Sequence, residues 1–487
     1  MEAEVKGENS YSTILKRISS FGGVQVFNIL INIVRGKFVA MFLGPDGMGI
    51  SSLLVSSTNT LQQLAGLGLN LAVVKEVAAG KENRDRLSEV MAVALRLILL
   101  TSLLGAGACF ILSPWLSLWT FGDYSYTLSF MVLSAGVALT VAGAGYLALL
   151  QGMGEVKRLA KASIVGGLTG LFCGVPLYYF FGNSGIVPAM IILALAIFIF
   201  YFFQFSRSVE YDRVKFTWNT HKPLVRKLIS LGLILMLGSL IGTFTNYLIN
   251  IFVRSFGSVD NVGYFQAANS LTNQYMGIIF SALALDYFPR LSAVSNDLPA
   301  MCKVVNRQTE IVTLIAAPIV LLLILSTPIV IDLLLTEEFM VITPLMRWMG
   351  LGVFFQAVTF PLGYIFIASE NKRIFIWLEV VFANLLWLAC GIGFYALYGL
   401  IGLGVSLVVR SAIEVVVTYL VCRHNYGLRY NREVILKAGI VTLLAIGGFL
   451  VSVLMEGILP VILEALILLV CLSFSLFYLR KGAVSKV

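Results

Sequence analysis

Long apolar runs alternate with short polar segments along almost the whole chain. A transmembrane helix needs about 20 mostly apolar residues to cross about 30 Å of hydrocarbon. Because each run is long and continuous, and not a strand of about ten residues with alternating polarity, we predict helices and not a β-barrel. The fourteen predicted helices cover residues 20–43, 47–74, 88–112, 127–150, 162–181, 184–206, 228–252, 262–285, 309–335, 343–369, 374–398, 400–422, 438–456 and 458–479.

The composition agrees with this pattern and excludes several classes of protein. Of the 487 residues, 59% are hydrophobic and only 12% are charged, about half of the roughly 25% charged residues in a soluble domain. The mean hydropathy of +0.93 excludes a soluble enzyme, a disordered chain and a coiled coil. An all-α polytopic membrane protein remains. The polar segment from Met1 to Tyr11 is not followed by a short cleavable apolar core, so we expect no signal peptide.

The basic residues predict the orientation of the helices. The even-numbered gaps between runs and the two ends of the chain hold 28 of the 34 basic residues. Because cytoplasmic loops are enriched in Lys and Arg, we predict that both termini are cytoplasmic. The net charge of +9 therefore reflects topology, and we expect no nucleic-acid partner. Six basic residues lie within or at the ends of the apolar runs: Arg35, Lys37, Arg96, Arg254, Arg347 and Arg410.

The chain also matches itself at an offset of 214 residues. Without a gap, Asn32 aligns with Asn246, Asp46 with Asp260, and the pair Thr58-Asn59 with Thr272-Asn273. Because six crossings separate the copies, we predict two six-helix lobes in a parallel pseudo-two-fold repeat. The predicted parts are an N-lobe at 1–210, a cytoplasmic linker at 211–227, a C-lobe at 228–424, and helices 13 and 14 with the C-terminal tail at 425–487.

Polar side chains recur at steps of three and four on the first two helices of each lobe, so each set shares one helix face. Such stripes can be polar contacts between helices. Four of them at repeated positions favour a water-filled lumen, because long amides are costly against lipid. The amides of these stripes that we predict to contact a substrate are Gln25, Asn28, Asn32, Asn59, Gln63, Asn246, Asn250 and Asn273.

Three of the basic residues are candidate anion ligands. Arg35 continues the polar face of the first helix near its middle, whereas Lys37 lies about 200° away around the helix. Arg254 ends the stripe of the seventh helix, where snorkelling to the interface is an equal alternative. The first lobe has no deep carboxylate, and guanidinium groups match phosphate oxygens well. We therefore predict an anionic cargo.

Deep carboxylates occur only in the second lobe. Glu379 lies at a depth similar to that of Glu414, and Arg410 is four residues before Glu414. Arg410 and Glu414 can form a structural ion pair. Alternatively, the three residues form a site at which Na⁺ or H⁺ couples transport to the membrane gradient.

The segment Leu43–Gly49, with the sequence LGPDGMG, and the Ser/Thr/Asn/Gln-rich helix after it carry a family resemblance. The segment is similar to the corresponding loop of bacterial polysaccharide-repeat-unit exporters, the Wzx-type O-antigen flippases. Over nearly its whole length, the chain resembles the multidrug/oligosaccharidyl-lipid/polysaccharide (MOP) exporter superfamily.

The resemblance implies a flippase in the bacterial inner membrane. Its cargo would be an undecaprenyl-diphosphate-linked oligosaccharide, an O-antigen or other surface polysaccharide repeat unit, moved from the cytoplasmic to the outer leaflet by alternating access. The cationic lumen would hold the diphosphate and glycan, and a groove beside helices 13 and 14 would hold the lipid tail. Membrane lipid and polysaccharide polymerase or assembly proteins are the other candidate partners.

Two alternatives stay within the same superfamily. The extra helix pair resembles lipid II flippases, and a cation-coupled multidrug antiporter would share the fold. An enzyme is not expected, because the longest outward gap, residues 113–126, has Asp123 as its sole acid. We predict no catalytic residue, cofactor or metal site. The six cysteines predict no disulfide, since none pair up in a loop.

Overall fold

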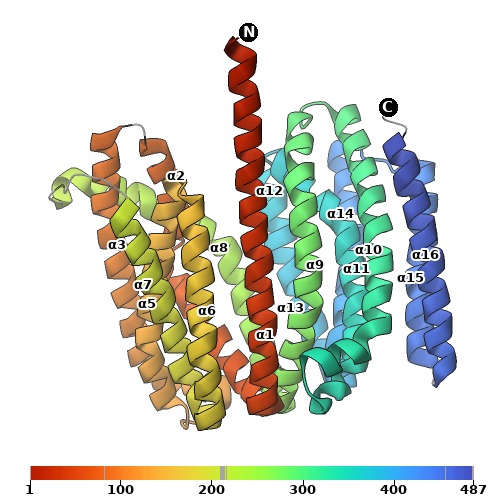
Figure 1. Ribbon diagram of the computed structural model, residues 1–487, viewed down its shortest axis with the longest axis horizontal. Helices are drawn as coiled ribbons and strands as arrows, with labels where there is room; N and C mark the ends of the chain where they lie inside the picture. Colours follow the sequence, from red (N-terminus) through yellow and green to blue (C-terminus); the bar gives the residue numbers. More distant parts are fainter. Residues whose placement is uncertain (1, 82, 209–213, 215–216, 456, 485–487) are drawn as a thin grey trace. The chain divides into compact units, whose positions relative to one another are not determined.

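A computed structural model of the chain describes residues 2–81, 83–208, 214, 217–455 and 457–484. Side chains are described for these residues except 2–26, 28, 156, 208, 219, 234–235, 274–276, 278–286 and 482–484. This part of the chain is helical and contains no strand, as Figure 1 shows. The prediction of an all-α fold is therefore confirmed.

Two compact units divide the chain, Met1–Ser255 and Phe256–Val487. The helices of the first are α1 (Glu2–Gly66), α2 (Leu69–Gly80), α3 (Arg84–Ile111), α4 (Ser113–Phe121), α5 (Thr127–Gly152), α6 (Val156–Phe181), the 3-10 turn η1 (Gly182–Gly185), α7 (Ile186–Ser208) and α8 (Trp218–Phe256). The second contains α9 (Val259–Ala293), α10 (Leu298–Leu334), the 3-10 turn η2 (Glu337–Ile342), α11 (Thr343–Ala368), α12 (Lys372–Phe375), the π-helix η3 (Ile376–Phe382), α13 (Ala383–Tyr398), α14 (Leu400–Tyr426), α15 (Arg432–Leu454) and α16 (Ile458–Val484).

The described residues contain eleven segments that are long and apolar enough to cross a membrane, so the protein is a multi-pass membrane protein. Each of the fourteen predicted runs lies mostly on helical backbone among the described residues. Two of the eleven segments, Ile29–Gly66 and Lys157–Arg207, each cover two predicted runs. The run 262–285 is not among the eleven, and most of its later side chains lie outside the described ones. The number fourteen stays a prediction.

The first two predicted helices are joined in α1, which passes through the LGPDGMG segment with a kink. Gly44 takes φ 64° and ψ −166°, a conformation that is essentially restricted to glycine. Pro45 follows, and its missing N–H costs little at the first turn of a restarted helix. A Cβ at Gly47 would lie 2.6 Å from Oδ1 of Asn183, so this position also has no room for a side chain.

The second helical segment ends earlier than predicted, at Gly66, and the chain restarts as α2. Leu67 and Gly68 have φ 47° and φ 62°, which breaks the helix. At this break the chain crosses α8 closely, because a Cβ on Gly68 would lie 2.1 Å from the carbonyl oxygen of Gly232. Glycine is thus required at Gly68 both by its backbone angle and by the crossing.

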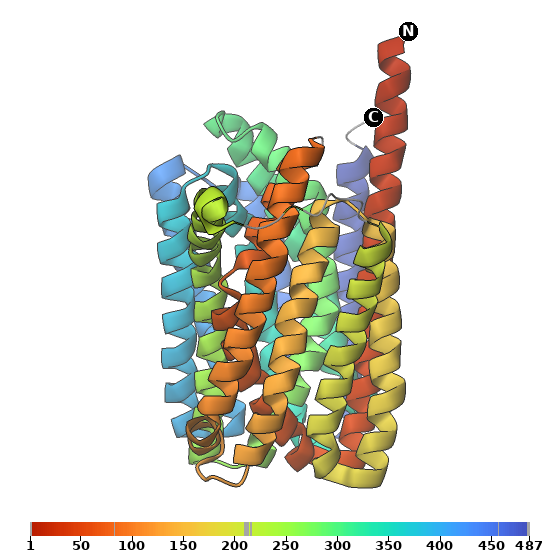
Figure 2. The same ribbon diagram turned by 90° about the vertical axis from the view of Figure 1, so that its left-hand side faces the viewer.

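The core of the first unit is built from apolar residues of α2, α3, α5, α6 and α7, with Val225 and Leu228 of α8 added to it. Met91, Leu149 and Leu228 are fully buried there. Helices α3 and α5 run side by side, as Figure 2 shows. Truncating such a buried side chain to Ala typically costs about 2–5 kcal/mol, so this cluster fixes the positions of the helices.

The core of the second unit joins α9, α10, α11, η3 and α14. Tyr287 is completely buried, and its hydroxyl donates to the carbonyl of Pro361 at 2.8 Å. That carbonyl contact satisfies the polar group that burial of a tyrosine would otherwise leave unpaired. Helix α9 is thereby fixed to α11 within the second unit.

Helix α8 is fixed to the first unit near both of its ends. Nζ of Lys227 lies 2.6 Å from Oε1 of Glu76, and the hydroxyls of Tyr247 and Thr120 are 2.7 Å apart. The predicted linker 211–227 falls partly outside the described residues, and its last ten residues belong to α8. The predicted lobe boundaries stay a prediction.

A polar pocket in the first unit and a charge cluster in the second

The first unit contains a pocket of about 300 Å³ lined mainly by amide and hydroxyl side chains. Asn59 and Gln63 are one turn apart on α1, so they share a helix face. The break at Leu67 and Gly68 turns the chain, and α2 then brings Asn70 to the same pocket. The remaining lining residues are Gln62, Gly66, Gly68, Thr140, Val141, Ala144 and Thr243.

No charged side chain lines this pocket. The Ser239 hydroxyl of α8 donates to Oε1 of Gln63 at 3.3 Å, which joins α8 to the amide face. Carboxamides offer both donors and acceptors, and hydroxyls offer one donor and two lone pairs. The pocket can therefore hydrogen-bond a neutral polyhydroxylated group.

The other predicted amides do not line this pocket. Asn32 is exposed on α1, and the Asn246 side chain donates to the carbonyl of Gly242 in its own helix. Asn250 is buried. In the second unit, Asn273 donates to Oδ1 of Asn269 at 2.6 Å. The side chains of Gln25 and Asn28 lie outside the described residues.

The three candidate basic residues also lie outside the amide pocket. Nη2 of Arg35 is 3.4 Å from the Tyr178 hydroxyl of α6, so its guanidinium points toward that helix. Lys37 is half-buried on α1. Nη2 of Arg254 donates to the carbonyl of Trp119 at 3.2 Å and so binds the C-terminal end of α4.

Asp123 lies just after this end of α4 and is also close to Arg254. The backbone N–H and the hydroxyl of Ser125 donate to its carboxylate at 2.9 Å and 2.5 Å. These hydrogen bonds, with a smaller contribution from the Arg254 charge, lower the pKa of Asp123 below its usual value.

The second unit brings Glu379, Arg410 and Glu414 together. Nε of Arg410 is 2.7 Å from Oε1 of Glu414, and its guanidinium lies 5.4 Å from the ring centre of Trp387. Glu379 interacts electrostatically with both other residues. It also packs on Gly363 of α11, where a Cβ would lie 2.9 Å from Oε1 of Glu379.

Glu379 is carried by the π-helix η3, a feature that the apolar pattern did not predict. A π-helical turn inserts an extra residue and changes the direction of the side chains that follow. The cluster of Glu379, Arg410 and Glu414 contains two acidic side chains and one basic side chain. Within the described residues, no three His, Cys, Asp or Glu side chains are arranged to hold a metal ion.

A nearly buried carboxylate in the first unit was not singled out by sequence reasoning. Only 4% of the Glu76 side chain is exposed, and it lies between Lys227 at 2.6 Å and Arg86 at 3.7 Å. Its sequence signal was an acid within the apolar stretch of α2, beside basic residues that we used only for orientation. Gln62 and Thr140 were also missed.

A family model described as polysaccharide biosynthesis protein matches residues 38–344. The chain belongs to this family. The match includes the Leu43–Gly49 segment on which the predicted resemblance rests, and that prediction is confirmed.

Individual relatives of the chain agree with the family match. The "Lipid III flippase" of Escherichia coli K12 is 25% identical over 352 residues, 71% of this chain and 83% of that protein. The "Putative O-antigen transporter" of Shigella flexneri is 22% identical over 400 residues, 79% of this chain and 92% of that protein. The structure of the lipid II flippase MurJ in an inward closed conformation aligns with a TM-score of 0.71 and 15% identity, over 96% of this chain and all of that one. At that identity the likeness shows a shared fold.

Proposed function

We propose that this protein is a flippase for an undecaprenyl-diphosphate-linked oligosaccharide, a repeat unit of O-antigen or another surface polysaccharide. The observation that carries the proposal is the pocket lined by Asn59, Gln63 and Asn70, which offers hydrogen bonds and no charge to a ligand. A neutral glycan is the part of such a cargo that needs this environment, because its hydroxyls must be paired away from water. The family match and the two relatives named for lipid III and O-antigen support this cargo class.

In this proposal the protein lies in the bacterial inner membrane with both termini in the cytoplasm. The bias of Lys and Arg toward alternate gaps supports that orientation. The cargo would then enter from the cytoplasmic leaflet and leave to the outer leaflet by alternating access.

The test is a flipping assay with the purified protein in liposomes that contain an undecaprenyl-diphosphate-linked oligosaccharide. Oligosaccharide that appears on the opposite leaflet is measured with an impermeant lectin or glycosidase. Asn59→Leu combined with Gln63→Leu is expected to lower the rate about 30-fold, since each lost hydrogen bond contributes about 1 kcal/mol. Transport of lipid II, but not of the oligosaccharide-linked lipid, would instead assign the protein to lipid II flipping.

Arg35 is our candidate ligand of the diphosphate, and its contact with Tyr178 requires a control. Arg35→Ala is expected to reduce flipping strongly, and Arg35→Lys to restore part of the rate because the charge returns without the planar fork. Tyr178→Phe removes only the hydroxyl that Arg35 contacts. If Tyr178→Phe reduced flipping as much as Arg35→Ala, Arg35 would act by fixing α6 and not by binding phosphate.

We infer that Glu379, Arg410 and Glu414 form the site at which Na⁺ or H⁺ is coupled to transport. Two carboxylates share one guanidinium, so one negative charge is left for a cation. Replacing both acids by Gln should abolish gradient-driven flipping while leaving slow downhill exchange. Gradient-driven flipping that is unchanged in the Glu379→Gln, Glu414→Gln double variant would exclude this site.

A further inference from the structure

A second and larger pocket, of about 1100 Å³, lies in the second unit between α10, α15 and α16. Its lining changes from basic to apolar along the helices. Lys303, Arg307 and Lys481 belong to the helix ends, whereas Leu314, Ile440 and Phe474 lie further along their helices. The members of the Glu379 cluster do not line it. The pocket thus has a basic end and an apolar end.

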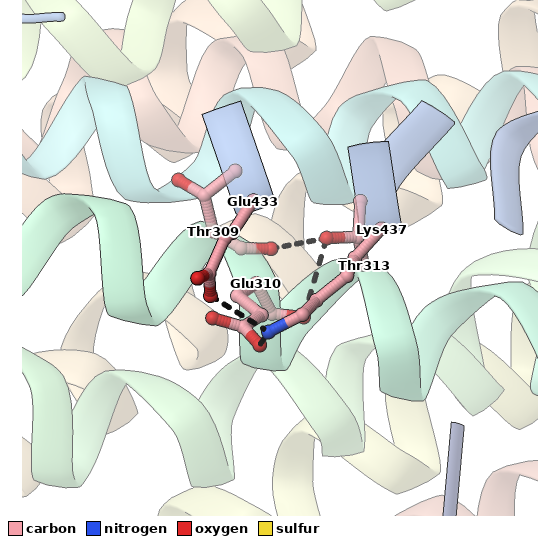
Figure 3. A network of polar contacts seen from close by, with 5 residues as sticks. All are labelled: Thr309, Glu310, Thr313, Glu433 and Lys437. Carbon is pink, nitrogen blue, oxygen red and sulfur yellow. Dashed lines mark hydrogen bonds and ion pairs between the residues drawn. The ribbon is translucent and has the colours of Figure 1, made fainter. Parts of the chain in front are cut away.

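The charged side chains in the middle of this pocket contact one another. Figure 3 shows Lys437 between two carboxylates, with Nζ 2.7 Å from Oε1 of Glu310 and 3.7 Å from Oε2 of Glu433. The same Nζ lies 4.9 Å from the ring centre of Tyr478. Two carboxylates and one ammonium leave one negative charge at this level of the pocket, so the phosphate of an anionic ligand is favoured at the basic end and not here.

The lining as a whole is positive, because it includes four basic residues and two acidic ones. Both acids lie beside Lys437, and the other three basic residues belong to the basic end. Lys303 and Lys481 are exposed, and neither has an ion-pair partner within 4 Å among the described residues. Arg307 adds a third positive charge to the same end.

The basic and apolar ends of the pocket lie on opposite sides of the predicted membrane boundary. On α10, Lys303 precedes the predicted run 309–335 by six residues, about 9 Å at 1.5 Å per residue, and Leu314 lies five residues, about 8 Å, inside that run. A lipid with its phosphate at the basic end would therefore place its acyl chain along the apolar end.

We propose that this pocket binds an anionic phospholipid of the surrounding bilayer, with the phosphate held by Lys303, Arg307 and Lys481 and one acyl chain beside Leu314 and Phe474. Basic pockets between membrane helices bind acidic headgroups by the same combination of charge and apolar contact. The pocket is lined by α15 and α16, the helix pair beside which the family resemblance places the lipid tail of the cargo. We assign it to a bilayer phospholipid instead, and this assignment can fail while the flippase function holds.

The experiment uses the full chain in nanodiscs that contain equal amounts of phosphatidylglycerol and phosphatidylethanolamine. Lipids that stay bound after transfer to detergent are counted by native mass spectrometry. The triple variant Lys303→Gln, Arg307→Gln, Lys481→Gln is expected to retain phosphatidylglycerol on the order of 100-fold less tightly, since each basic side chain contributes about fivefold. Retention of phosphatidylethanolamine is expected to stay the same.

Two further variants separate the pocket from general surface charge. Lys372→Gln, Arg373→Gln, Arg423→Gln removes the same charge from exposed positions of the second unit that do not line the pocket, and should keep phosphatidylglycerol bound. Ile440→Trp fills the apolar end from a position that is 42% exposed, and should lose the lipid although every charge remains.

Several results would overturn the proposal. Equal loss in the two triple variants would mean that the lipid responds to surface charge in general. Equal retention of both lipids by the wild type would remove the role of the headgroup. Displacement of phosphatidylglycerol by glycerol 3-phosphate would assign the basic end to a soluble phosphate. Displacement by the lipid-linked cargo at equal concentration would assign the pocket to the cargo's own chain.

Discussion

The two copies of the repeated helix pair join their helices in different ways. In the first copy the chain stays helical through Gly44 and Pro45, with the kink taken up by the positive φ of the glycine. At the corresponding position of the second copy, α8 ends and Ser258 begins α9, its hydroxyl oxygen accepting from the N–H of Asn261. The same position in the repeat is thus occupied in the first copy by a glycine with a positive φ and in the second copy by a serine that caps the next helix.

The two copies also differ in the hydrogen bonds of their amide side chains. Asn59 lines the pocket of the first unit and has no hydrogen-bond partner among the described residues. Its counterpart Asn273 donates one N–H to Oδ1 of Asn269 one turn earlier. Equivalent positions in a repeat therefore need not share a function, since the first amide keeps all its donors and acceptors for a ligand and the second keeps fewer.

The largest effect on the free energy of unfolding is expected at the connection between the two helices of each copy. Gly44→Val forces a β-branched residue into a glycine conformation, and should lower the free energy of unfolding by about 3 kcal/mol. Ser258→Ala removes only a cap and should cost about 1 kcal/mol. Reversible unfolding in detergent mixtures measures both values. Equal losses of unfolding free energy would mean that the two helix connections contribute equally to stability.

A smaller effect is expected from Arg254, whose equivalent in the first copy is Ala40. Arg254→Met keeps the length of the side chain but removes the hydrogen bond to the Trp119 carbonyl. The loss should be about 1 kcal/mol of unfolding free energy, because the side chain is partly exposed. The flipping rate per folded molecule should stay constant. A fall in that rate with unchanged stability would instead make Arg254 a substrate ligand.

The roles of Asn59 and Asn273 can be compared directly by measuring the flipping rate of variants at each position. Asn59→Leu should reduce the flipping rate about fivefold, the equivalent of one hydrogen bond of about 1 kcal/mol. Asn273→Leu should change the rate much less, because its partner is a neighbouring side chain. The liposome assay described above measures both. Similar losses at the two positions would show that both lobes contact the cargo.

The smallest effect is a pH dependence at Asp123, beside the end of α8. Hydrogen bonds from Ser125 lower the pKa of this carboxyl, so they stabilise the folded chain above the ordinary Asp value near 4. That contribution is lost as the pH falls through the lowered pKa. Ser125→Ala should therefore be less stable than the wild type at pH 6, by well under 1 kcal/mol since the site is exposed. The difference should vanish near pH 2 in unfolding titrations, and a constant difference would exclude this origin.

The helices themselves could be predicted because run length and hydropathy are local properties. The irregularities within these helices could not be predicted, since the positive φ of Leu67 and the π-helical turn at Glu379 depend on packing against other helices. For the site, the three- and four-residue steps correctly placed Asn59 and Gln63 on one face. The contact of Arg35 with Tyr178 joins residues 143 apart in sequence, which no periodicity reports.

The nearly buried Glu76 between Lys227 and Arg86 has a consequence for how related chains vary. Loss of this carboxylate alone is unfavourable, because the two half-exposed cations Lys227 and Arg86 would then lie close together without the negative charge between them. Positions 76 and 227 are therefore expected to change together during evolution. A charge swap that reverses the pair, Glu76→Lys with Lys227→Glu, should be better tolerated than Glu76→Lys by itself.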